Sequence, residues 1–125
     1  MRKFVRYQLP AILWAMLIFG LSSIPGLSTP EIGIKPTDKL AHLVEFGIFG
    51  YLITRAFYHS NFSLRRYSIA LGITLGILYA LSDEFHQSFV PGRDVSLGDI
   101  IADSLGVVLA QIMFIKFNIC KQHKP

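Results

Sequence analysis

The sequence predicts an all-α integral membrane protein built as a bundle of four transmembrane helices. Three observations lead to this fold class: 52% of the residues are hydrophobic, only 16% are charged, and the mean hydropathy is +0.48. The charged residues gather at the ends of long apolar runs, whereas a soluble bundle spreads them along one face of each helix. We expect the 125 residues to form a single transmembrane domain, residues 1–125.

Four apolar segments are long enough to cross the hydrocarbon of a bilayer, which takes roughly 20 helical residues. We expect transmembrane helices at about residues 8–24, 38–58, 67–89 and 97–119. Loops rich in proline and glycine separate the first helix from the second and the third from the fourth. The first run also fits a cleaved signal peptide, but a signal anchor explains it equally well because the following segments are themselves apolar enough to stay in the membrane.

The distribution of Lys and Arg predicts the orientation in the membrane. Of the 12 such residues, all but Lys35, Lys39 and Arg93 lie near the two termini or around the connection between the second and third helices. Cytoplasmic segments carry the excess of Lys and Arg, so we expect a multi-pass protein with both termini in the cytoplasm. The basic residues form no stripe with interleaved aromatic residues, which excludes a nucleic-acid-binding protein.

Small residues mark one face of the third and fourth helices. Gly72, Gly76 and Ala80 share a narrow arc of the third helix, and Gly106 and Ala110 share one on the fourth. Such residues let neighbouring helices approach closely within a membrane. We therefore expect these arcs to face the bundle interior.

The same faces become polar toward the outer ends of the helices. On the second helix, Asp38, His42 and Glu45 spread over only about 60°. Carboxylates facing acyl chains are costly, so the polar faces of three helices should meet in one cluster, with the first helix packing outside it. The residues expected to bind a ligand there are Asp38, Lys39, His42, Glu45, Asp83, Glu84, Gln87, Arg93, Ser96, Asp99 and Asp103.

Acidic residues outnumber basic residues in this cluster. Protonation of some carboxyls, a bound divalent cation, or neutralisation by Arg93 and Lys39 would each resolve the excess, and the sequence leaves all three open. Glu84, Asp83 and His42 are candidate catalytic residues. Polar residues near helix ends also pair across helices without any chemical role, which is the structural alternative.

The chain resembles the VanZ-like family along essentially its whole length. The resemblance is carried by Ser22-Ser23-x-Pro25, by Asp38-Lys39-x-x-His42, and by Asp83-Glu84-x-x-Gln87-x-Phe89-x-Pro91-Gly92-Arg93 with Ser96, Asp99, Asp103 and Gly106. One departure is Asp103, where relatives often carry Asn. The resemblance implies a small bacterial membrane protein, from a family named for a member that confers low-level resistance to the glycopeptide teicoplanin.

Three functions are compatible with this pattern. The first is an envelope protein whose outward polar cluster binds a glycopeptide or a lipid-linked precursor. The second is a membrane-embedded, metal-assisted hydrolase or transferase acting on a lipid-linked substrate, although the sequence contains no HExxH, GxSxG or P-loop motif. The third is an ion-coupled carrier, which is disfavoured because the ionisable residues stop in the outer half.

Overall fold

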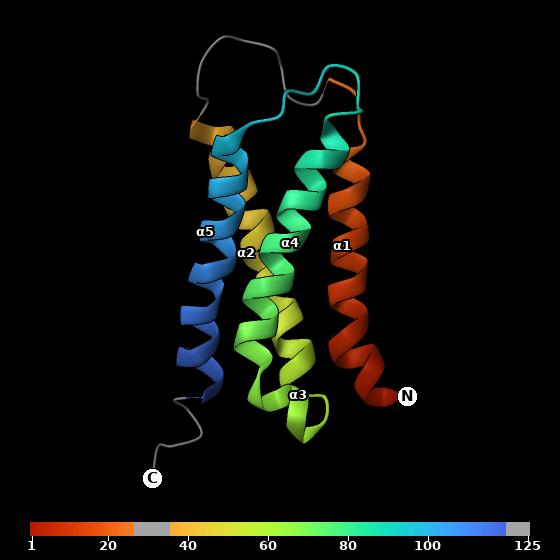
Figure 1. Ribbon diagram of the computed structural model, residues 1–125. Helices are drawn as coiled ribbons and strands as arrows, with labels where there is room; N and C mark the ends of the chain where they lie inside the picture. The colour runs from red at the N-terminus through yellow and green to blue at the C-terminus, as the bar shows by residue number, and fades with distance from the viewer. Residues whose placement is uncertain (27–35, 120–125) are drawn as a thin grey trace.

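The computed structural model describes residues 1–26 and 36–119 as a bundle of long helices (Figure 1). No strand occurs within those two ranges. The elements, in chain order, are a π-helical turn η1 (Phe4–Gln8), α1 (Leu9–Ser22), α2 (Pro36–Tyr58), α3 (Phe62–Arg66), α4 (Ser68–Gln87), α5 (Leu97–Phe114) and a second π-helical turn η2 (Ile115–Ile119).

Capping residues and turns fix where the helices begin and end. The side chain of Asn61 accepts a hydrogen bond from the Leu64 N–H and starts α3. The hydroxyl of Ser96 likewise accepts from the Gly98 N–H, at 3.2 Å, and starts α5. Gly92 has a φ of 76°, a left-handed conformation that suits glycine, in the turn between α4 and α5.

Four helices are long and apolar enough to cross a membrane, which confirms the predicted all-α fold of a multi-pass membrane protein. They cover Phe4–Ser22, Thr37–Tyr58, Ser68–Gln87 and Leu97–Asn118. The first begins four residues earlier than expected, and the third ends two residues earlier, because the chain turns there through a hydrogen bond from the Val90 N–H to the Gln87 carbonyl. The short helix α3 was not predicted.

Helices α2, α4 and α5 pack on one another, and α1 lies against α2 and α4. Only 6% of the first span is buried, compared with 33% to 39% of the other three. The small-residue faces lie inside, as predicted: a Cβ added at Gly106 would lie 2.2 Å from the Leu43 carbonyl oxygen, and one at Gly76 would lie 2.7 Å from a methyl of Val107. Glycine therefore sets how closely α2 and α4 approach α5.

The two ends of the bundle differ in chemistry. At one end, here called the polar end, α1 and α4 finish while α2 and α5 begin (Figure 1). Every Asp and Glu among the described residues lies in the half of its helix nearer the polar end, or in the loop beside that end. The opposite end, here called the basic end, carries α3 with Arg65 and Arg66. The assignment of the basic end to the cytoplasm stays a prediction from the distribution of Lys and Arg.

Candidate functional site

The polar end brings together all eleven residues that the sequence proposed as a ligand-binding cluster. Helices α2 and α5 supply residues from their first turns, and α4 supplies residues from its last turns. Burial here is deep for charged side chains: Asp83, Glu84, Asp99 and Asp103 are 7%, 2%, 6% and 0% exposed. Charged groups are rarely buried without partners, so the contacts of each one decide what the cluster can do.

The deepest contact joins α2 to α5. Nδ1 of His42 lies 3.0 Å from Oδ1 of Asp103, and the His42 side chain is only 11% exposed. Glu84 of α4 lies beside this pair, and its Oε2 accepts a hydrogen bond from the Ser96 N–H at 3.1 Å. One carboxylate thus ties the end of α4 to the start of α5.

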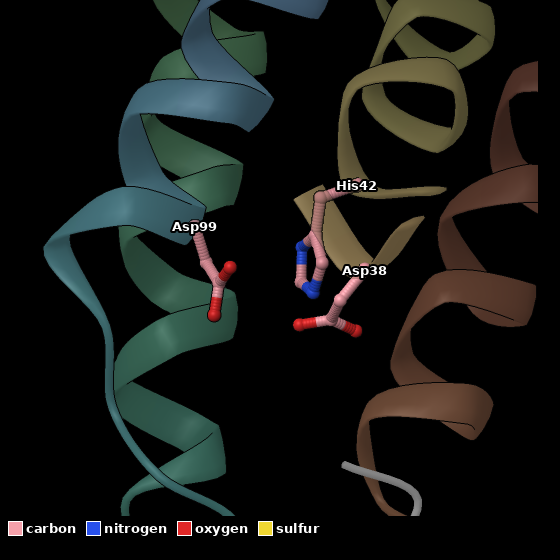
Figure 2. A group of neighbouring side chains, drawn as sticks. All are labelled: Asp38, His42 and Asp99. Carbon is pink, nitrogen blue, oxygen red and sulfur yellow. The ribbon is translucent and has the colours of Figure 1, made fainter. Parts of the chain in front are cut away.

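A second contact joins the first turn of α2 to the first turn of α5. Lys39 forms an ion pair with Asp99 and also donates to the hydroxyl of Ser96, at 3.1 Å. Figure 2 shows the carboxylates of Asp38 and Asp99 turned toward the ring of His42 from the two helices. Lys39 and Arg93 were the two side chains expected to neutralise the acidic excess. Of these, Lys39 pairs with Asp99.

A pocket of about 200 Å³ lies between α1, α2 and α4, next to these contacts. Its polar lining includes His42, Glu45 and Asp83, together with Arg93 from the loop after α4. Its residues are Ile18, Leu21, Ser22, Asp38, Ala41, His42, Glu45, Asp83, Gln87 and Arg93. The pocket is lined by both apolar and ionisable side chains.

The position of α1 corrects one expectation. We expected the first helix to pack outside the site, but Ile18, Leu21 and Ser22 line the pocket, and Arg93 donates to the Leu21 carbonyl at 2.7 Å. The apolar pattern of α1 gave no sign of this role. The Ser22-Ser23-x-Pro25 sequence at its end is the signal that could have indicated it.

Several buried polar atoms of the cluster have no hydrogen-bond partner among the described residues. Nε2 of Gln87 donates to Oδ2 of Asp83 at 2.9 Å, so this oxygen is partnered. The unpartnered atoms at the polar end include Glu45 Oε1, Glu84 Oε1, Arg93 Nε and Asp103 Oδ2. An unpartnered buried polar group costs stability, so these atoms have hydrogen-bonding capacity available for a ligand.

Two groups of side chains in the cluster have the composition and spacing of a metal site. In one group, Asp38, His42 and Asp99 each offer a ligand atom, and these atoms lie within 4.8 Å of one another. In the other, His42, Glu84 and Asp103 do so at the same spacing. Both groups mix one imidazole nitrogen with carboxylate oxygens, a donor set that suits divalent transition metals.

Comparisons with known proteins identify the family of the chain. The profile of the VanZ/LLP1 family matches residues 4–119. A similar protein is "Uncharacterized protein C11E3.10" of Schizosaccharomyces pombe (strain 972 / ATCC 24843), which is 31% identical over 115 residues, covering 91% of this chain and 67% of the relative. No solved structure matches. The chain belongs to the VanZ/LLP1 family.

Proposed function

We propose that this protein binds the headgroup of a lipid-linked molecule in the pocket at its polar end. The observation that carries the proposal is the mixed lining of the pocket, with apolar Ile18 and Leu21 from α1 beside ionisable Glu45 and Arg93. A lipid-linked molecule has the same two parts, an acyl or isoprenoid chain joined to a polar headgroup. A pocket at membrane level with both linings suits the junction between them.

The unpartnered atoms describe the headgroup. Nε of Arg93 is a donor that lacks an acceptor, and Oε1 of Glu45 is an acceptor that lacks a donor, within the described part of the chain. Both residues line the pocket. A headgroup that offers oxygen acceptors as well as hydroxyl or amine donors would satisfy both residues at once, as the headgroup of a cell-envelope precursor does.

The packing of α1 supports entry from the bilayer. Helix α1 lines one side of the pocket, and it is the least buried of the four spans. Three hydrogen bonds to backbone carbonyls involve α1: Trp14 donates to Glu45 at 3.0 Å, and the carbonyls of Ala15 and Leu21 accept from Tyr79 at 2.6 Å and from Arg93 at 2.7 Å. Because little of α1 is buried, displacing it would give a lipid-linked molecule a lateral route to the pocket.

The resemblance to the VanZ-like family gives this binding a consequence in bacteria. If the polar end faces outward, a bound glycopeptide or cell-wall precursor is held where teicoplanin acts. Sequestering either one lowers the amount of drug that reaches its target. We therefore propose low-level teicoplanin resistance as the phenotype of this binding in a sensitive bacterial host.

Native mass spectrometry of the purified full-length protein tests the binding directly. We expect the wild type to retain a lipid-linked molecule and Arg93→Ala to lose it. Asp94→Asn is the matched control, because Asp94 is exposed in the same loop and does not line the pocket. Equal retention by wild type and Arg93→Ala would overturn the proposal.

Teicoplanin susceptibility tests the phenotype. At matched membrane levels, we expect a sensitive host to be protected by the wild type and by Asp94→Asn but not by Arg93→Ala or Asp99→Asn. The reason is that Asp99 forms the ion pair with Lys39 that joins α5 to α2 within the cluster. Protection by every variant would show that resistance does not depend on the polar end.

A second candidate function is a metal-assisted hydrolase or transferase acting on the same lipid-linked class. The two groups of candidate metal ligands favour it. In this function a divalent cation would activate water or polarise the headgroup, and a carboxylate such as Glu84 would act as general base. Turnover of a lipid-linked substrate that stops on chelation and returns with added metal would support it, and chelator-insensitive turnover would contradict it.

A further inference from the structure

The most buried part of the cluster is formed by three side chains from three different helices. His42 comes from α2, Glu84 from α4 and Asp103 from α5, and one potential ligand atom of each lies within 4.8 Å of the others. Glu84 is 2% exposed and Asp103 is 0% exposed. These carboxylates are therefore almost completely removed from solvent.

Each of the two carboxylates satisfies only one of its oxygens. Oε2 of Glu84 accepts from the Ser96 N–H, and Oδ1 of Asp103 contacts His42. Oε1 of Glu84 and Oδ2 of Asp103 have no hydrogen-bond partner in residues 1–26 and 36–119. Two bare oxygens of buried carboxylates near one imidazole call for a positively charged species between them.

The basic side chains of the cluster do not meet this need. Lys39 is paired with Asp99 and Ser96, and Arg93 donates to the Leu21 carbonyl and lines the neighbouring pocket. A proton on His42 would serve only the oxygen that it already contacts. A proton shared between the two carboxylates is the alternative way to complete the cluster, and saturable metal binding distinguishes the two.

We infer that His42, Glu84 and Asp103 form a binding site for one small divalent transition-metal cation. The 3.0 Å between Nδ1 of His42 and Oδ1 of Asp103 fits two adjacent ligands of one ion, which lie about 3 Å apart when metal–ligand distances are near 2.1 Å. One imidazole and two carboxylates supply three ligands. Three protein ligands leave further positions open for water or a substrate oxygen.

The other candidate group shares His42 but is less suited to an ion. Asp99 is already paired with Lys39, so the lysine ammonium competes with a metal ion for this carboxylate. Asp38 is also only partly buried. The buried group has no ion pair with a lysine or arginine within the described residues, and of the two groups it alone contains unpartnered carboxylate oxygens.

This site goes beyond the proposed function, because it holds an ion whether or not the pocket holds a headgroup. The two are adjacent, since His42 both belongs to the ion site and lines the pocket. Binding of the cation and retention of the lipid-linked molecule are separate measurements. Failure of one leaves the other intact.

Titration of the purified, metal-free full-length protein with Mn²⁺, followed by electron paramagnetic resonance, tests the site. Mn²⁺ prefers oxygen and imidazole ligands over the thiol of Cys120, the single cysteine of the chain. We expect one bound ion per chain, with hyperfine coupling from a nitrogen nucleus that reports His42. No saturable binding, or bound Mn²⁺ without nitrogen coupling, would overturn the inference.

Three variants locate the ion. Glu84→Gln keeps an acceptor for the Ser96 N–H and should weaken Mn²⁺ binding at least tenfold, the order found when metal-site groups are replaced. Asp38→Asn tests the alternative group and should weaken Mn²⁺ binding less than Glu84→Gln does. Asp94→Asn is the exposed control and should bind like the wild type. Unchanged binding by Glu84→Gln, or a tenfold loss confined to Asp38→Asn, would overturn the buried site.

A thermal measurement separates loss of the site from loss of the fold. Saturating Mn²⁺ should raise the melting temperature of the wild type, because the ion binds only the folded chain. Glu84→Gln should melt as a folded protein and gain nothing from Mn²⁺. An equal gain in both proteins would place the ion elsewhere and overturn the inference.

Discussion

The bundle buries polar side chains in two regions that differ in whether their hydrogen bonds are complete. Nearer the basic end, the hydroxyl of Thr54 donates to Oε1 of Gln111 at 2.8 Å, and Nε2 of Gln111 donates to the Val107 and Gly50 carbonyls. Thr54 and Gln111 are 0% and 3% exposed, and neither has an unpartnered atom. The cluster at the polar end is equally buried but leaves several polar atoms bare.

The difference separates a completed structural network from the cluster that we propose as a ligand site. A completed network joins two helices and specifies their register. Bare buried atoms add no hydrogen bonds to the bundle, and in our proposal a ligand completes their contacts. The same helices α2 and α5 therefore hold the bundle together near the basic end and carry the proposed site at the polar end.

The largest expected effect comes from the packing that both regions share. Gly106→Leu places a side chain where even a Cβ lies 2.2 Å from the Leu43 carbonyl, so α2 and α5 must separate. We expect a loss of about 3 kcal/mol or more in the free energy of unfolding in detergent. Gly20→Leu is the control, because a Cβ at Gly20 meets nothing within 4 Å. Equal stability of the two variants would contradict the close approach.

A smaller effect is expected from opening the complete network. Gln111→Leu leaves the Thr54 hydroxyl without its acceptor and should cost about 1 kcal/mol of unfolding free energy. The double variant Thr54→Val with Gln111→Leu removes both partners and should recover part of that loss. A purely additive double variant, measured by the same denaturation, would show that the two side chains do not act as a pair.

The polar end should show the opposite behaviour. Glu84→Gln removes a buried charge whose Oε1 has no partner, so the metal-free protein should keep its unfolding free energy or gain slightly. Binding of Mn²⁺ should nevertheless weaken at least tenfold. A destabilisation as large as that of Gln111→Leu would mean that Glu84 acts mainly as a structural residue.

The smallest effect concerns pH at the basic end. Burial lowers the pKa of His59 below its ordinary value, and the nearby cations Arg55, Arg65, Arg6 and Lys3 lower it further. The folded protein then disfavours the protonated ring, so stability is complete above the ordinary pKa and is lost as pH falls through the lowered one. Between pH 7.5 and 5, the melting temperature should fall more for the wild type than for His59→Gln; identical falls would contradict this assignment.

Helical periodicity predicted the spans and the shared polar face because both follow from local residue spacing. The buried residues of α4 include Gly72, Gly76, Ala80 and Asp83, the arc expected from the sequence. Periodicity does not give the rotation of one helix against another. The sequence therefore could not show that Lys39 would take Asp99, or which carboxylate oxygens would remain bare.

The first helix was the least predictable part of the site for the same reason. A uniformly apolar helix has no polar face that indicates its neighbour, so the role of Ile18 and Leu21 in the pocket depended on tertiary packing alone. The short helix α3 was missed because its five residues lie in a connection that the apolar pattern does not describe.

The backbone and the side chain of Glu45, in α2, make separate contacts. The Glu45 carbonyl accepts the hydrogen bond from Trp14 that joins α1 to the core, while the Glu45 carboxylate lines the pocket. A carbonyl is present whichever amino acid occupies this position. A substitution at position 45 therefore changes the lining of the pocket without removing the hydrogen bond that attaches α1.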